Sequence, residues 1–275
     1  MMALVENLKV STQIKLAQKK KHQAKVPLHI EMGNYIIKTA DNSEELISSF
    51  KLRHEVFNNE FRGIEGEGFD FDEFDKIFDH LIIIHKSSQQ IIGTYRLNSS
   101  KFSKKSYTAL EFNMPFLNND VSYLELGRAC IHKDFRKGAV ISLLWRGIAQ
   151  YMKLSGADLL IGCSSVKVNH PREASLLYKY LLDAGHISEF FHSSPTPNFA
   201  MENFESWYNT HRLDIDAQKK QEAQDLLPSL LRSYIKLGAK ISGEPAFDRD
   251  FDCIDFLTVL RKEDLSKLLA DKFQV

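Results

Sequence analysis

A carboxylate and a guanidinium lie three residues apart in an otherwise apolar stretch of the sequence, at Glu125 and Arg128 of YLELGRACI. Burial among apolar neighbours raises the pKa of a carboxyl group toward the range that suits a general base, and a nearby arginine lowers it again. The sequence leaves open which effect is larger. The pair therefore fits either proton transfer in a reaction or a structural ion pair.

A polar turn follows this stretch and contains Arg136, Lys137 and Gly138. An amphipathic helix begins just after the turn, because apolar residues recur every three or four positions from Ile141 to Met152. The first backbone N–H groups of a helix have no partner within the helix, and beside two cations and a glycine they can bind a phosphate. The sequence thus places an anion site directly after a carboxylate-bearing strand.

Seven carboxylates and a single lysine crowd the segment IEGEGFDFDEFDKIFDH. So many negative charges require cations or water. The segment lacks the glycine and terminal glutamate of an EF-hand at the right spacing, so we predict no metal site. Either this is a solvated acidic loop, or Arg96 and Arg128 neutralise the carboxylates around Asp72 and Asp75.

The cysteines and histidines form no nucleophilic or metal-binding pattern. Cys163 has neither a glycine elbow nor a neighbouring histidine, so we predict a core residue rather than a nucleophile. Cys130, Cys163 and Cys253 lie in unrelated segments without paired spacing, which argues against zinc and against disulfides. His132 and His170 are predicted to be structural or loop residues.

Strands and helices alternate on both sides of the central stretch. The apolar runs predict strands at residues 35–39, 81–85, 90–97, 123–131, 158–166 and 253–260, and the periodic segments predict helices at 43–57, 141–152, 172–184, 226–238 and 262–273. Strand, helix and strand in succession indicate parallel pairing. The expected fold class is α/β, a mixed central sheet flanked by helices.

Composition sets the remaining bounds. The chain has 275 residues, 43% of them hydrophobic, and a net charge of zero, so it can bury a sizeable core and offers no global field for nucleic acid. No apolar run approaches the roughly 20 residues that span a bilayer, and the N-terminus lacks a signal-peptide core, so we expect a cytoplasmic protein. We expect a basic extension over residues 1–33 and one domain over 34–275, with an excursion at about 186–224 that is rich in His, Ser, Pro and aromatic residues.

The amino-acid sequences of several segments resemble those of a known family. ELGRACIHKDFRKGAVISLLWRGIAQYM, LRHEVF, FDEFD, GTYRL and LPSLLRSYIKLGAKISGEPAFDRDFDCIDFLTVL are similar to the ornithine acyltransferase and N-acyl amino acid synthase family of the Gcn5-related N-acyltransferase (GNAT) fold. That family is related to the acyl-homoserine-lactone synthases. The resemblance runs in pieces from about Phe50 to Leu260 and leaves out residues 1–33 and 186–224.

The resemblance implies transfer of a fatty, or 3-hydroxy fatty, acyl group to the α-amine of an amino acid such as ornithine. The donor would be acyl carrier protein, and less readily acyl-CoA, because Ala139 and Ile141 follow Gly138 where acetyl-CoA enzymes of the fold have further glycines. No tightly bound cofactor is implied. The implied roles are a general base (Glu125), residues that shape the acceptor and donor cleft (Arg53, Phe57, Asp72, Asp75), partners of the acceptor carboxylate (Arg96, Arg128) and the donor phosphate site (Arg136, Lys137, Gly138, Ala139, Ile141).

Other functions stay open. The chain could act as an acyl-homoserine-lactone synthase-like enzyme, or as a non-catalytic acyl-carrier or lipid-binding protein of the same fold. An N-acyl amino acid product partitions into membranes, so contact with the inner face of the membrane is expected beside the cytoplasmic location. The basic extension would suit an acidic carrier protein or anionic lipid, and the excursion could form a lid over the acyl chain or touch the membrane surface.

Overall fold

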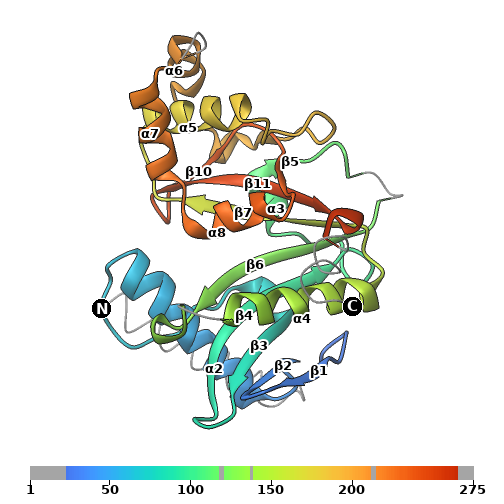
Figure 1. Ribbon diagram of the computed structural model, residues 1–275. Coiled ribbons are helices and arrows are strands. Elements are labelled where there is room, and N and C mark those ends of the chain that lie inside the picture. Colours follow the sequence, from blue (N-terminus) through green and yellow to red (C-terminus); the bar gives the residue numbers. More distant parts are fainter. Residues whose placement is uncertain (1–22, 118–120, 137–138, 212–214, 266–275) are drawn as a thin grey trace. The chain divides into compact units, whose positions relative to one another are not determined.

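The computed structural model describes residues 23–117, 121–136, 139–211 and 215–265, and these form two compact units (Figure 1). Unit 1 comprises the chain up to Lys105 together with Leu126–Gly156, and unit 2 comprises Ser106–Glu125 together with the chain from Ala157 onward. Strand β6 (Tyr123–Ile131) passes from one to the other. Its first three residues belong to unit 2 and the remainder to unit 1.

Unit 1 is built on a largely antiparallel sheet in the order β1-β2-β3-β4-β6. The strands before β6 are β1 (His29–Met32), β2 (Tyr35–Thr39), β3 (Asp79–His85) and β4 (Gln90–Ser99). The polar turn between β3 and β4 makes them a hairpin with a bulge between Ile83 and Ile84. The predicted strands of this half of the chain are confirmed, and β1 adds one that the sequence did not reveal.

Helices cover both faces of this sheet, which is why β3 contains the unbroken apolar run from Leu81 to Ile84. Gly147 of helix α4 (Val140–Ser155) lies against Leu81 of β3. The next residue along β3, Ile82, points to the other face and packs with Leu46 and Phe50 of helix α2 (Ser43–His54). Side chains alternate across a strand, so a run of apolar residues is stable only when both faces are buried.

Helix α2 begins at Ser43, where the sequence predicts it, but the helical segment ends later than predicted. Its N-cap is Asn42, whose side chain accepts the backbone N–H of Glu45 at 2.9 Å. The helix then continues as a π-helix, η1 (Glu55–Phe61), to Phe61 instead of ending near Phe57. The acidic segment that follows contains a short 3-10 helix, η2 (Glu73–Lys76), capped by Asp72 with Asp75 completing a capping box.

Unit 2 contains the order β6-β7-β11-β10, with β9 paired to β11. Strand β7 (Leu159–Val166) runs parallel to β6 over Tyr123–Glu125, and β11 (Cys253–Arg261) runs antiparallel to β7. Two further short strands, β9 (Lys240–Ile241) and β10 (Ala246–Asp248), flank β11, and β5 (Phe112–Asn113) pairs with β8 (Ser194–Pro195). The buried core here includes Phe112, Tyr123, Ile161, Leu257 and Val259.

The expected excursion at 186–224 contributes helices to unit 2. Helix α6 (Phe204–His211) packs on α5 (Pro171–Asp183) through Tyr178, whose ring meets Phe204 and Tyr208 edge to face. Helix α7 (Ala217–Leu226) joins α5 through an ion pair between Arg172 and Glu222, at 2.9 Å. The two helices thus lie beside α5 (Figure 1). The remaining described helices of unit 2 are α3 (Thr108–Glu111), η4 (Pro197–Phe199) and α8 (Ser229–Lys236).

Part of the expected N-terminal extension is packed rather than solvated. The backbone N–H groups of Lys25 and Val26 donate to the two carboxylate oxygens of Asp79, at 3.1 and 3.0 Å, and β1 pairs with β2. Residues 1–22 lie outside the described residues, as do 266–275 of the expected terminal helix, whose first turn is seen at residues 262–265. The boundary at residue 33 stays a prediction. Within the described residues, no helix is both long and apolar enough to cross a membrane.

Candidate active site

Three arginines and three aspartates of unit 1 interlock in one cluster, which we call the arginine–aspartate network: Arg53, Arg96, Arg128, Asp70, Asp72 and Asp75. Helix α2, strand β4 and strand β6 each supply an arginine, and the acidic segment supplies all three aspartates. The formal charges therefore balance. These contacts are the ones expected if Arg96 and Arg128 neutralise the acidic segment, which was one of the two possibilities that the sequence left open.

Arg53 is the buried centre of the network. Its side chain is 1% exposed and donates to Asp75 Oδ1 at 2.6 Å and to Asp70 Oδ1 through Nε at 2.7 Å. Burial alone would lower the pKa of a guanidinium, but the charges of Asp75 and Asp70 outweigh it and raise the pKa of Arg53. Correspondingly, burial raises the pKa of Asp75 but the attraction of Arg53 and Arg96 holds it well below its usual range.

Arg96 and Arg128 meet at Asp72. Arg96 donates to both oxygens of Asp72, at 2.6 and 2.7 Å, and Arg128 donates to Asp72 Oδ2 at 3.1 Å. The side chains of Arg128 and Asp72 are 17% and 25% exposed, against 1% for Arg96, so this pair is the part of the network that a ligand can reach. Arg128 has a φ of +50°, a left-handed backbone that directs its side chain and costs strain of about 1–3 kcal/mol.

Two other residues support the network. His80 on β3 is fully buried, and its Nε2 lies 3.8 Å from Asp75 Oδ1. Burial lowers the pKa of His80 to about 4 despite the attraction of Asp75, so the imidazole is neutral at pH 7. Phe57, in η1, packs its side chain on the core cluster that includes Leu46 and Phe50 of α2.

Glu125 lies in unit 2, at the last residue that pairs β6 with β7. Its side chain is buried, with 2% of the residue exposed, and its Oε1 accepts two hydrogen bonds from Thr108, from the backbone N at 2.7 Å and from Oγ1 at 2.9 Å. Thr108 begins helix α3, so the carboxylate fixes the start of that helix as well as its own orientation. The two hydrogen bonds from Thr108 orient the carboxylate, and a carboxylate oxygen can accept a proton.

Three further carboxylates of unit 2 gather close to one another: Glu111, Asp248 and Asp255, each with an oxygen within 4.8 Å of the others. All three are buried. Burial, together with the charges of Asp255 and Asp248, raises the pKa of Glu111 to about 9, so Glu111 is a neutral acid at pH 7. Asp248 accepts the backbone N–H groups of Asp250 and Phe251, and Asp255 accepts Ser165 Oγ at 2.7 Å. Cys163 lies near this group, and burial raises its pKa well above the ordinary value, as expected of a core thiol.

The expected phosphate site lies only partly within the described residues. Lys137 and Gly138 fall outside them. Ala139 is the N-cap of α4 without a side-chain hydrogen bond, no acidic residue stands in the first turn, and Ile141 is half-buried there. Arg136 donates to the carbonyl of Ile131 at 3.0 Å and pairs with Glu60 at 2.7 Å.

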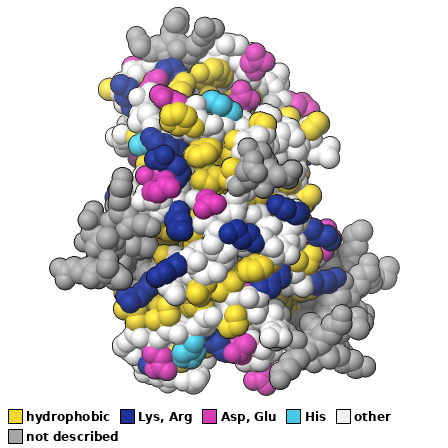
Figure 2. Space-filling model, turned by 90° about the vertical axis from the view of Figure 1, so that its right-hand side faces the viewer, with side chains coloured by type: hydrophobic (Ala, Val, Ile, Leu, Met, Phe, Trp, Pro, Cys, Tyr) yellow, Lys and Arg dark blue, Asp and Glu magenta, His cyan; other side chains and the backbone are white. Residues whose placement is uncertain are grey.

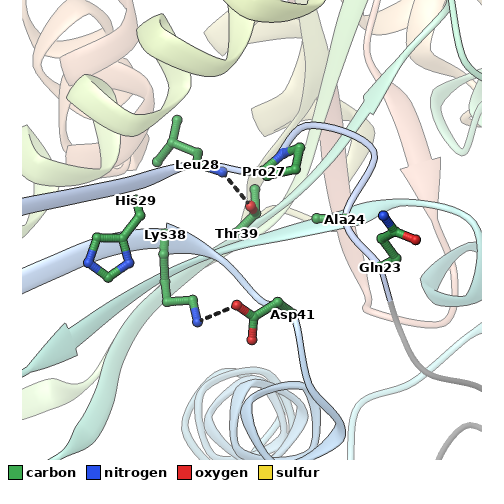
Figure 3. A pocket seen from close by; sticks show the side chains of 8 residues that line it. All are labelled: Gln23, Ala24, Pro27, Leu28, His29, Lys38, Thr39 and Asp41. Carbon is green, nitrogen blue, oxygen red and sulfur yellow. Dashed lines mark hydrogen bonds and ion pairs between the residues drawn. The ribbon is translucent and has the colours of Figure 1, made fainter.

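A pocket of about 620 Å³ in unit 1 lies apart from the predicted site residues (Figure 3). It is lined by residues of β1, β2 and their flanks, including His29, Lys38, Thr39 and Asp41. Lys38 is already paired with Asp41 at 3.0 Å and with Glu45 at 2.7 Å, and Thr39 Oγ1 accepts the N–H of Leu28. Because these polar groups are satisfied by one another, the pocket offers no chemistry of its own.

The sequence-based prediction named the three arginines and two of the three aspartates of the network, and it missed several of their partners. Asp70, His80 and Thr108 were not singled out, although each touches a predicted site residue. Asp70 carried a signal, since it lies two residues from Asp72 in the acidic segment. Thr108 and the three buried carboxylates of unit 2 are distant in sequence from their partners and carried none.

Comparisons with known proteins agree with this fold. A family model described as an acetyltransferase (GNAT) domain matches residues 52–146. The L-ornithine N(alpha)-acyltransferase of Agrobacterium fabrum is 26% identical over 245 residues, 83% of this chain and 81% of the relative. That of Rhodobacter capsulatus is 27% identical over 249 residues, 85% of this chain and 92% of the relative.

Solved structures include similar chains at low identity. An N-acyl amino acid synthase from uncultured soil microbes is 9% identical with a TM-score of 0.49, covering 90% of this chain and 99% of that one. A CoA-dependent acyl-homoserine lactone synthase is 13% identical with a TM-score of 0.45, covering 84% and 83%.

The described sheet and the family match together define the class: the chain carries a GNAT domain, and the predicted α/β fold is confirmed. The protein itself is an N-acyltransferase, related over most of its length to enzymes that acylate an α-amine.

Proposed function

We propose that this N-acyltransferase moves a fatty acyl group, which can carry a 3-hydroxyl, from a phosphopantetheine thioester to the α-amine of an amino acid such as ornithine. The relatives that cover most of the chain are named for that acceptor. Acyl carrier protein is the proposed donor in preference to acyl-CoA. The product is an N-acyl amino acid, and the proposed location is the cytoplasm, at the inner face of the membrane.

The observation that carries this proposal is the buried Glu125, whose carboxylate is oriented by two hydrogen bonds from Thr108. The acceptor enters as an ammonium and must lose one proton before its nitrogen can attack. We assign that proton to the carboxylate of Glu125. The amine then forms the new C–N bond at the thioester carbonyl and the C–S bond breaks. The nitrogen gives up its second proton as the amide forms, and the sulfur takes up one proton and leaves as a thiol, while Glu125 returns its proton to water.

The other proposed roles follow from charge. Arg128 and Arg96 would orient the acceptor carboxylate at the partly exposed Arg128–Asp72 pair. Asp75, itself paired with Arg53, would hold Arg96 from the buried side. Phe57 and Asp72 would shape the cleft. The start of α4 would hold the donor phosphate through its free N–H groups, with Arg136, Lys137, Gly138, Ala139 and Ile141 around it.

Glu125→Gln tests the proposal. The glutamine carbonyl can still accept both hydrogen bonds from Thr108, so the fold should be kept while the base is lost. We expect kcat with acyl carrier protein and ornithine to fall about 10²–10⁴-fold, measured by mass spectrometry of the amide product. The matched control is Glu111→Gln, a second buried glutamate of unit 2 that has no assigned role and should keep activity. A Glu125→Gln enzyme as active as the control would refute the assignment.

The same assay separates the two other functions. Offering S-adenosylmethionine in place of ornithine tests acyl-homoserine-lactone synthesis, which would yield a lactone instead of an acyl amino acid. If the wild-type chain binds acyl carrier protein but produces no amide with any amino acid, it is a binding protein of the same fold, and the transferase proposal fails.

A further inference from the structure

A loop and a helix end of unit 1 together expose two large hydrophobic side chains among lysines. The set comprises Lys101, Phe102, Lys104, Lys105, Lys153 and Leu154, which we call the lysine patch. Phe102 is 44% exposed and Leu154 is 54% exposed. The two segments are held together because Lys101 Nζ donates to the carbonyl of Gly156, at 2.5 Å. Figure 2 shows a face on which lysine or arginine side chains adjoin hydrophobic ones.

The loop of the lysine patch is preformed. The side-chain amide of Asn98 donates to the carbonyls of Ser103 and Lys105, at 3.1 and 2.9 Å, and the backbone N–H of Phe102 donates to the carbonyl of Ser99 at 2.9 Å. Phe102 is therefore presented outward by a fixed backbone. Binding through this side chain would cost little ordering of the loop.

Leu154 is not needed by the helix that carries it. Helix α4 buries Tyr151, Met152 and Ser155 against unit 1, whereas Lys153 and Leu154 face outward. A leucine on the outer face of an amphipathic helix contributes nothing to the core. Its exposure next to a lysine instead creates the mixed apolar and cationic surface found in segments that lie at a membrane interface.

The ammonium groups of Lys104, Lys105 and Lys153 are available to a partner, whereas that of Lys101 donates to the carbonyl of Gly156 and adds its charge from there. Ion pairs among the described residues use other lysines, namely Lys38, Lys86, Lys133 and Lys179. All four charged residues of the patch are lysines and none is arginine. Arginine dominates where a protein partner offers carboxylates for paired hydrogen bonds, while lysine acts as a point charge on a long apolar stem, which suits the diffuse negative field of a lipid surface.

Other exposed hydrophobic residues lack this setting. Ile64 is 50% exposed but is followed by Glu65 and Glu67, and Phe190, at 81%, follows Glu189. Acidic neighbours would be repelled by an anionic bilayer. Ile64 therefore offers a matched control within the same unit.

We propose that the lysine patch binds the enzyme to anionic phospholipid, with Phe102 and Leu154 entering the interface and the four lysines facing the headgroups. The benefit of this membrane contact to the enzyme rests on the proposed function. An N-acyl amino acid is amphiphilic, and an enzyme bound to the membrane can release it directly into the bilayer. The contact itself needs no turnover.

Co-sedimentation of the full chain with vesicles tests the proposal, using phosphatidylcholine alone and phosphatidylcholine with about one third phosphatidylglycerol. We expect binding to the anionic vesicles only. Each lysine removed in Lys104→Gln and Lys105→Gln should lower the partition coefficient about fivefold, with a larger loss when both are changed. Phe102→Ser and Leu154→Ser should each weaken binding to the anionic vesicles, both in the wild-type chain and in the lysine variants. Ile64→Ser should leave vesicle binding unchanged.

Two results would overturn the proposal. One is unchanged vesicle binding in the Lys104→Gln, Lys105→Gln double variant. The other is weaker binding of that variant to acyl carrier protein with vesicle binding intact, which would assign the patch to an acidic protein. Glu125→Gln should bind vesicles normally, so failure of the catalytic proposal and failure of this one are distinguishable. A thermal unfolding midpoint equal to that of the wild type shows that each variant is folded.

Discussion

Arg53 shows how a single buried residue can hold a charged network together. It is 1% exposed and satisfies two aspartates, so the cost of burying its charge is offset only while both partners are present. Arg53 also holds Asp70 and Asp75 in place, and these contact Arg128 and Arg96 at the partly exposed end of the network. Stability and site geometry are linked through this one side chain.

Replacing Arg53 with methionine keeps most of its volume but leaves Asp75 and Asp70 buried without that cation. We expect the free energy of unfolding to fall by about 3–5 kcal/mol, measured by urea denaturation. The control is Arg136→Met, which breaks an ion pair whose side chains are 43% and 31% exposed and should cost no more than about 1 kcal/mol. Equal losses in the two variants would show that the network adds no stability.

How much of the site could be predicted depended on sequence distance. Asp72, Asp75, Arg53 and Arg96 were predicted as site residues because each lies in a sequence motif shared with the same family. In the structure, Arg53 pairs with Asp75 and Arg96 pairs with Asp72. The cluster of three buried carboxylates in unit 2 could not be predicted. Glu111 lies more than a hundred residues from Asp248 and Asp255, and sequence spacing does not indicate which distant residues come close in the fold. The roles assigned to these residues stay predictions.

At the scale of elements, helix α4 is fitted closely to the sheet of unit 1 at Gly147. An added Cβ at this position would lie 2.8 Å from Ile37 Cγ2 and 2.9 Å from two carbons of Leu81. Glycine inside a helix usually costs about 1 kcal/mol relative to alanine, so its presence here reflects the close approach of helix and strands.

Gly147→Ala should therefore destabilise the protein even though alanine is the better helix former. Overpacking costs about 1–3 kcal/mol and outweighs the gain in propensity, which predicts a lower thermal unfolding midpoint. Ser142→Ala on the exposed side of α4 should leave the midpoint equal or slightly higher. If Gly147→Ala behaved like Ser142→Ala, the helix would have room to move away from the sheet.

The elements that the sequence predicted well are those whose pattern is local. The run of mostly apolar residues predicted β6, and the recurrence of apolar residues every three or four positions predicted α4. The π-helix η1 was missed because its extra residue per turn leaves no pattern in seven residues. The short strands β5 and β8 were missed because each consists of two residues and exists only through its partner.

For the whole molecule, two buried groups set opposing trends of stability with pH. Between about pH 4 and 6.5 the unfolded chain holds a proton on His80 that the folded chain lacks, so stability rises with pH. Between pH 4.5 and about 9 the folded chain holds a proton on Glu111 that the unfolded chain has released, so stability falls as pH rises. Each trend is limited to about 1.4 kcal/mol per pH unit.

These slopes offset each other where they overlap, which predicts a wild-type free energy of unfolding that is nearly constant from pH 4.5 to 6.5 and declines from 6.5 to 8. Glu111→Gln removes only the falling trend. The variant should gain stability with pH up to 6.5 and then stay level, so that its advantage over the wild type grows steadily toward pH 8. Urea denaturation across this range measures both curves. Parallel curves would mean that Glu111 is ionised in the folded protein, and that a cation or a proton elsewhere among the three buried carboxylates balances its charge.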